Sequence, residues 1–193
     1  MRKIVLPALA GLLVATSPAG AATTGLGSVQ VLVAEAPEDP KPVLKALNNL
    51  DGYGEATWDA ETLSFKVIAE DSTRSHPRRV AKAVSEAGIP VNEVRLEFID
   101  AWTRIDDGIG WMYSDANDAR YFVLFSVQST RFWPFQQQNR WGQDVPMHFV
   151  MRAAFGKVHP DGTADPDSVE ILSFEPNREL TDKIDAARKA GEQ

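Results

Sequence analysis

Six periodic segments occur between residues 28 and 100, in the order strand, helix, strand, strand, helix, strand, and no other feature constrains the fold as strongly. Valines at alternate positions between Ser28 and Ala34 are typical of a half-buried strand. Apolar residues from Val43 to Leu50 recur instead at helical spacing. The segments are, in order, residues 28–34, 43–50, 54–58, 63–68, 75–88 and 94–98. This order predicts a ferredoxin-like βαββαβ module with its helices on one face of the sheet.

Residues 101–193 form the second predicted region. The segment 101–118 is irregular and rich in turn signals, with one short candidate strand inside it. Strands are predicted at 111–113, 120–128, 147–158 and 169–174. A final amphipathic helix is predicted to begin at Asn177 or at Thr181 and to reach Lys189. In that helix Leu180, Ile184 and Ala187 would face inward. We therefore predict an α+β chain in which the module is followed by a three- or four-stranded antiparallel sheet with a C-terminal helix. Whether the two regions share one sheet is left open.

The first 21 residues have the pattern of a secretory signal peptide. A basic pair, Arg2 and Lys3, precedes an apolar run and then the small residues of an A-x-A cleavage site. The run contains Pro7 and is much shorter than the roughly 20 residues that span a bilayer. We predict cleavage before Ala22, no membrane insertion of the mature chain, and a periplasmic or otherwise extracytoplasmic location. A retained membrane anchor is the alternative.

The net charge limits which partners the chain can bind, and the cysteine content limits which interactions can stabilise its fold. The formal net charge is −7, which disfavours nucleic acid as a partner. The chain contains no cysteine, so an exported form has no disulfides and depends on its apolar core. Five tryptophans and nine phenylalanines supply large side chains for that core.

Three stretches of the first module carry a family resemblance. They are Lys45–Tyr53 (KALNNLDGY), Asp59–Val67 (DAETLSFKV) and Ala81–Ile89 (AKAVSEAGI). They resemble the first helix, the central hairpin and the second helix of heavy-metal-associated domains, the fold of copper and mercury carriers. The resemblance implies a metal loop in which the paired thiols of the family would fall at Ala36 and Asp39. A methyl group and one carboxylate do not suit soft ions, so the resemblance implies a carrier scaffold without its metal chemistry.

The segment from Ser129 to Pro146 is predicted to be a long loop with an unusual concentration of aromatic and arginine residues. Its candidate binding residues are Arg131, Phe132, Trp133, Phe135, Arg140 and Trp141. Such a composition is typical of protein-binding surfaces. The alternative is a loop folded back over the sheet, with its aromatic rings in the core.

Metal ligands and catalytic groups are few. Met112, Met147, His148 and Met151 form a soft-ligand group, but alternation along a strand would place His148 opposite Met147 and Met151. Asp39 is a candidate ligand for a hard cation. No motif of a known hydrolase or phosphate-binding loop occurs, and no cofactor is predicted. The sequence thus favours a non-catalytic binding protein with a protein partner. Two alternatives are copper-type metal trafficking and an enzyme with a cleft between the two regions.

Overall fold

The structure is a computed structural model of the 193-residue chain. It describes residues 25–71, 74–106, 109–114, 119–124, 126–139, 147–157, 159, 160, 165 and 167–176, with four single positions further on. The predicted signal peptide therefore lies outside the described residues.

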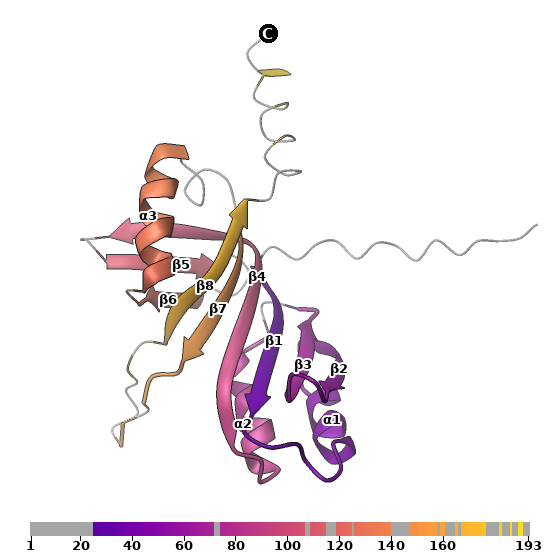
Figure 1. Ribbon diagram of the computed structural model, residues 1–193. Coiled ribbons are helices and arrows are strands. Elements are labelled where there is room, and N and C mark those ends of the chain that lie inside the picture. The colour runs from indigo at the N-terminus through magenta and orange to yellow at the C-terminus, as the bar shows by residue number, and fades with distance from the viewer. Residues whose placement is uncertain are drawn as a thin grey trace, which may run out of the picture.

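The described part of the chain forms an α+β fold, as predicted (Figure 1). Its strands are β1 (Gly25–Val33), β2 (Tyr53–Asp59), β3 (Ser64–Ala69), β4 (Val91–Asp106), β5 (Ile109–Ser114), β6 (Ala119–Val123), β7 (Met147–Ala154) and β8 (Ser168–Pro176). Its helices are α1 (Lys41–Asn48), α2 (Pro77–Glu86) and α3 (Val127–Asn139). No helix among the described residues is long and apolar enough to cross a membrane.

The first four strands pair in the order β2-β3-β1-β4, and every pairing among them is antiparallel. Val31 of β1 lies opposite Phe65 of β3 on one side and Val94 of β4 on the other. Because side chains alternate across a strand, all three point to the same face, where they are buried. The strands and helices of this segment lie where the periodicity of the sequence predicts them.

Strand β4 corrects the predicted sheet. The sequence predicts a strand ending near Phe98 and irregular chain after Ala101, whereas β4 continues to Asp106. It pairs with β1, β7 and β5, so the two regions share one sheet that is larger than predicted. The pairings β4–β5, β5–β6, β6–β8, β8–β7 and β7–β4 close these five strands into a ring. The extension was missed because hydrogen bonds to β5 carry it, and residues 101–106 show no apolar alternation.

Helix α3 corrects a second prediction, because it replaces the end of a predicted strand and the start of a predicted loop. Strand β6 ends at Val123, and a reciprocal cap begins α3. The Ser126 amide donates to Ser129 Oγ at 2.6 Å, and the Ser129 amide donates to Ser126 Oγ at 3.2 Å. This is the geometry of a capping box with serine in place of the usual Glu or Gln. The helix includes Pro134, a residue that disfavours a helix interior, and it lies partly in the segment that was predicted to be a loop.

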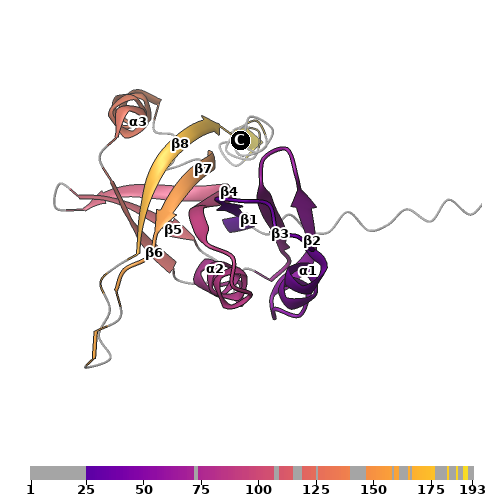
Figure 2. The same cartoon turned by 60° about the horizontal axis from the view of Figure 1, so that its bottom comes forward.

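A single buried core lies against one face of the sheet and includes side chains from all three helices. In Figure 2, α1 and α2 lie together, and α3 lies apart from them beside β8. Helix α1 contributes Val43 and Leu47, α2 contributes Val80 and Val84, and α3 contributes Phe132. We call this the inner face. The opposite, outer face carries no described helix. The predicted helix at 177–189 lies almost entirely outside the described residues.

Candidate functional site

The predicted binding residues divide between a buried ring, a surface and undescribed positions. Phe132 is 0% exposed, and its ring lies 5.2 Å from that of Phe149 and 5.1 Å from that of Phe174. Trp133 is half-buried, with its ring 4.8 Å from Phe132. Arg131 is exposed. Phe135 lies in α3 with its side chain undescribed, and Arg140 and Trp141 lie outside the described residues. Phe132 is therefore a core residue that presents no surface to a partner.

An exposed apolar surface lies at the start of α3. Val127 is 70% exposed and Leu124 is 36% exposed. Arg131 follows Val127 by four residues, so both side chains lie on the same side of the helix. We call Leu124, Val127 and Arg131 the α3 patch. Its two apolar members were missed from the sequence because residues 120–128 read as a buried strand.

The candidate metal ligands do not come together. Met147 and Met151 are fully buried on the inner face, whereas His148 lies on the outer face, as alternation predicted. Asp39 is exposed, and its Oδ1 accepts the amide hydrogen of Lys41 at 3.0 Å, at the start of α1. Among the described residues there is no group of three or more His, Cys, Asp or Glu side chains that could hold a metal ion.

The described contacts between the two regions are filled by side chains. The rings of Phe98 on β4 and Tyr121 on β6 meet edge-to-face, 5.6 Å apart. Arg78 of α2 pairs with Asp167, which also accepts the Gly156 amide at 2.9 Å. These contacts tie α2 to the segments that flank β7 and β8.

A polar network crosses five strands on the outer face, with Glu97 of β4 at its centre. Ser28 Oγ donates to Glu97 Oε2 at 2.6 Å, and Lys66 Nζ lies 3.1 Å from the same oxygen. His148 Nε2 lies 3.2 Å from Glu97 Oε1, and His148 Nδ1 lies 3.0 Å from Glu175 Oε1. The network therefore connects β3, β1, β4, β7 and β8.

The network lowers the pKa of the Glu97 carboxyl group. Partial burial acts to raise the pKa of Glu97, but the hydrogen bonds from Ser28 and Lys66 and the charges of Lys66 and His148 outweigh it. The pKa is therefore lowered from its usual range. The Ser28 hydroxyl donates to this carboxylate and not to His148, so the arrangement differs from that of a serine nucleophile with a histidine base.

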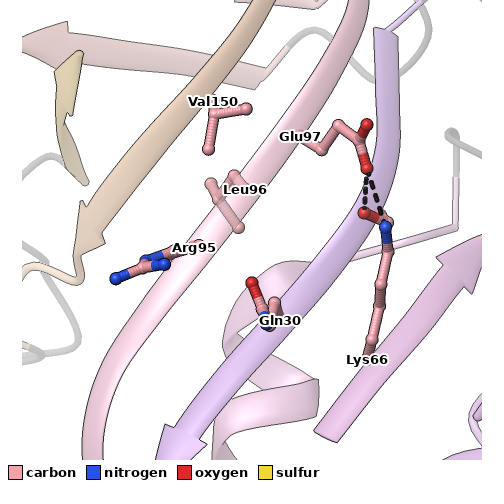
Figure 3. Close-up of a pocket in the computed structure, with 7 residues that line it drawn as sticks. Gln30, Lys66, Arg95, Leu96, Glu97 and Val150 are labelled. Atoms are coloured by element: carbon pink, nitrogen blue, oxygen red, sulfur yellow. Dashed lines mark hydrogen bonds and ion pairs between the residues drawn. The ribbon is translucent and has the colours of Figure 1, made fainter. Parts of the chain in front are cut away.

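A hollow of about 190 Å³ adjoins Glu97 on the outer face (Figure 3). Its walls come from β1, β3, β4 and β7 through Ser28, Gln30, Lys66, Arg95, Leu96, Glu97 and Val150. Pockets for drug-sized ligands usually measure about 300–1,000 Å³. The hollow is thus sized for one side chain or a molecule of a few atoms. Its polar residues follow strand alternation and read in the sequence as an ordinary solvated face.

Comparisons of this chain with protein-family models, with curated proteins and with solved structures give no match. Its function is therefore inferred from its own residues.

Proposed function

We propose that this chain is an exported, non-catalytic binding protein that acts by protein–protein contact through the α3 patch. The exposure of Val127 carries this proposal. Val127 is 70% exposed, and the exposed Arg131 lies on the same side of the helix. Apolar surface is thus available to a partner next to an arginine, a residue that is enriched at protein interfaces.

The packing of α3 supports the same proposal. Phe132 follows Val127 by five residues in α3. Its ring contacts those of Phe149 on β7 and Phe174 on β8. The reciprocal Ser126–Ser129 cap holds the first turn. A patch on a helix that is fixed in this way loses little conformational entropy on binding, which favours affinity.

The scaffold that presents the patch is proposed to be a ferredoxin-like module related to heavy-metal-associated domains. The strand order β2-β3-β1-β4 with two helices on one face supports this relationship. At the positions of the family's thiols the chain has Ala36 and Asp39, and the Asp39 carboxylate accepts an amide hydrogen at the start of α1. Residues 1–21 are proposed to direct export.

The interaction is tested by capture from the extracytoplasmic fraction of the source cells. The mature chain, a Val127→Asp variant and a Thr57→Asp variant are immobilised, and the retained proteins are quantified by mass spectrometry. Thr57 is exposed on β2, far from α3 in the strand order, so its variant adds the same charge elsewhere. We expect at least one protein to be retained by the wild type and by Thr57→Asp, and to fall about tenfold with Val127→Asp, as a loss of roughly 1.4 kcal/mol would produce. Equal retention by all three refutes the α3 patch.

Export is tested separately, by fractionation and sequencing of the mature N-terminus. Cleavage before Ala22 in the extracytoplasmic fraction is expected. A chain that is found uncleaved in the cytoplasm contradicts the proposal.

A further inference from the structure

Two opposite charges on the outer face of β4 turn away from each other. Arg95 and Glu97 are two residues apart on the same face, so their Cα atoms lie about 6.8 Å apart at about 3.4 Å per residue. Neighbours of opposite charge at this spacing commonly pair, yet Arg95 Nε pairs with Glu93 on the other side. Glu97 instead contacts Lys66 and His148. The space between the two charged groups is therefore not closed by an ion pair.

Both side chains line the hollow on the outer face (Figure 3). The other polar side chains beside it are short or turned aside. Ser28 donates to Glu97, and the Gln30 amide nitrogen donates to Ser64 Oγ at 2.8 Å. Val150 supplies an apolar part of the wall. The hollow thus has a cationic side, an anionic side and an apolar side.

Hydrogen-bonding groups remain open to a ligand on both charged sides. Arg95 pairs through Nε, and no described residue pairs with its two terminal nitrogens. None of the described residues donates to the amide oxygen of Gln30. The Arg95 side chain is 39% exposed and that of Glu97 is 31% exposed, so a small molecule can reach both.

The two charges define the chemistry of the ligand. An arginine guanidinium binds a carboxylate through two parallel hydrogen bonds, and a carboxylate or amide oxygen accepts the protons of an ammonium group. Two charge-assisted hydrogen bonds of about 2.8 Å each, with one carbon unit between the two ligand groups, span the gap from Arg95 to Glu97. A lone anion would be repelled by Glu97, and a lone cation by Arg95 and Lys66.

From these observations we propose that the hollow binds a free α-amino acid with a small aliphatic side chain. Its carboxylate lies on the Arg95 guanidinium, its ammonium group on Glu97 and Gln30, and its side chain against Val150. The volume of about 190 Å³ limits the ligand to a few non-hydrogen atoms. The site shares no residue with the α3 patch, so it stands or falls independently of the result for Val127→Asp.

The site is tested by titration of the isotope-labelled mature chain with glycine and with alanine, followed by NMR of the Gln30 side-chain amide. We expect a saturable shift of that signal with a dissociation constant in the millimolar range, because the site is half open to water. Acetate and methylammonium each carry only one of the two charges. At equal ionic strength both are expected to bind at least about tenfold more weakly.

A matched pair of variants separates the site from a general effect of charge. Arg95→Gln is expected to weaken glycine binding at least about tenfold. Arg152→Gln is the control, because Arg152 lies opposite Arg95, also pairs with Glu93 and does not line the hollow. It removes the same charge and is expected to leave binding unchanged. Val150→Phe changes no charge and is expected to abolish binding by filling the hollow.

Four results overturn the proposal. The first is the absence of a saturable shift with either amino acid. The second is equal affinity for glycine and for acetate or methylammonium, which would mean a site for a single charge. The third is an equal loss of binding in Arg95→Gln and Arg152→Gln. The fourth is unchanged binding in Val150→Phe, which would place the ligand outside the hollow.

Discussion

Replacement of Phe132 by alanine separates the core of α3 from its surface. The ring is 0% exposed and has three aromatic neighbours, with centroids at 4.8, 5.1 and 5.2 Å. Truncation of a buried phenylalanine typically costs about 3–5 kcal/mol through lost transfer energy and the cavity left behind. Each aromatic pair adds about 0.5–1.5 kcal/mol, which places Phe132→Ala in the upper part of that range.

Urea and thermal unfolding of the mature chain measure this cost. A loss of 3–5 kcal/mol corresponds to a fall in the melting temperature of about 6–20 °C, at 2–4 °C per kcal/mol for a chain of this size. Arg131→Ala is the matched control, because Arg131 is adjacent in the sequence and exposed, and it is expected to change stability by less than about 0.5 kcal/mol. A Phe132→Ala effect below about 0.5 kcal/mol would refute the packing of α3 against β7 and β8, since surface substitutions usually stay within that range.

Three further predictions follow from local geometry. Gly52→Ala is expected to destabilise the chain more than Gly88→Ala in urea unfolding. Both glycines have positive φ, at +87° and +80°, but a Cβ atom built on Gly52 would lie 2.8 Å from the Arg74 backbone, whereas one built on Gly88 meets nothing within 4 Å. Equal effects would contradict the Gly52 contact. Ser126→Ala is expected to cost about 1 kcal/mol through loss of the α3 cap, and an unchanged urea midpoint would argue against that cap. The lowered Glu97 pKa stabilises the fold above the usual glutamate value of about 4.3, and this contribution is lost as pH falls through the lower folded pKa. Glu97→Gln should therefore weaken the acid dependence of the unfolding free energy, and an unaltered dependence would contradict the network.

The local patterns of the first module were readable from the sequence. The valines of β1 recur every second residue, and the apolar residues of α1 and α2 recur with the helical period of 3.6. In each element these residues form the one face that is buried. The cap of α3 was equally local, but Ser129 occupies the position where Glu or Gln is usual, so the capping pattern was not recognised.

The candidate site was less predictable. The sequence singled out Phe132 and Arg131 together because aromatic and arginine residues mark interfaces, yet one is buried and the other exposed. Phe132 is buried because it packs on Phe149 and Phe174, which belong to strands further along the sequence. The Glu97 network was not anticipated, because its members come from five strands and each of them looks like an ordinary polar residue on a solvated face.

The sequence by itself determined the order of the first helices and strands and the side of each strand that is buried. It also determined that His148 lies on the opposite face of its strand from Met147 and Met151. These properties depend on residues a few positions apart and on whether each is apolar. Only the tertiary structure decided that β4 extends to Asp106, that β7 closes the ring of strands, and that α3 turns Phe132 inward and Val127 outward. Those outcomes depend on hydrogen bonds and ring contacts between segments that are distant in the sequence. Neither segment alone has a periodic pattern that predicts such contacts.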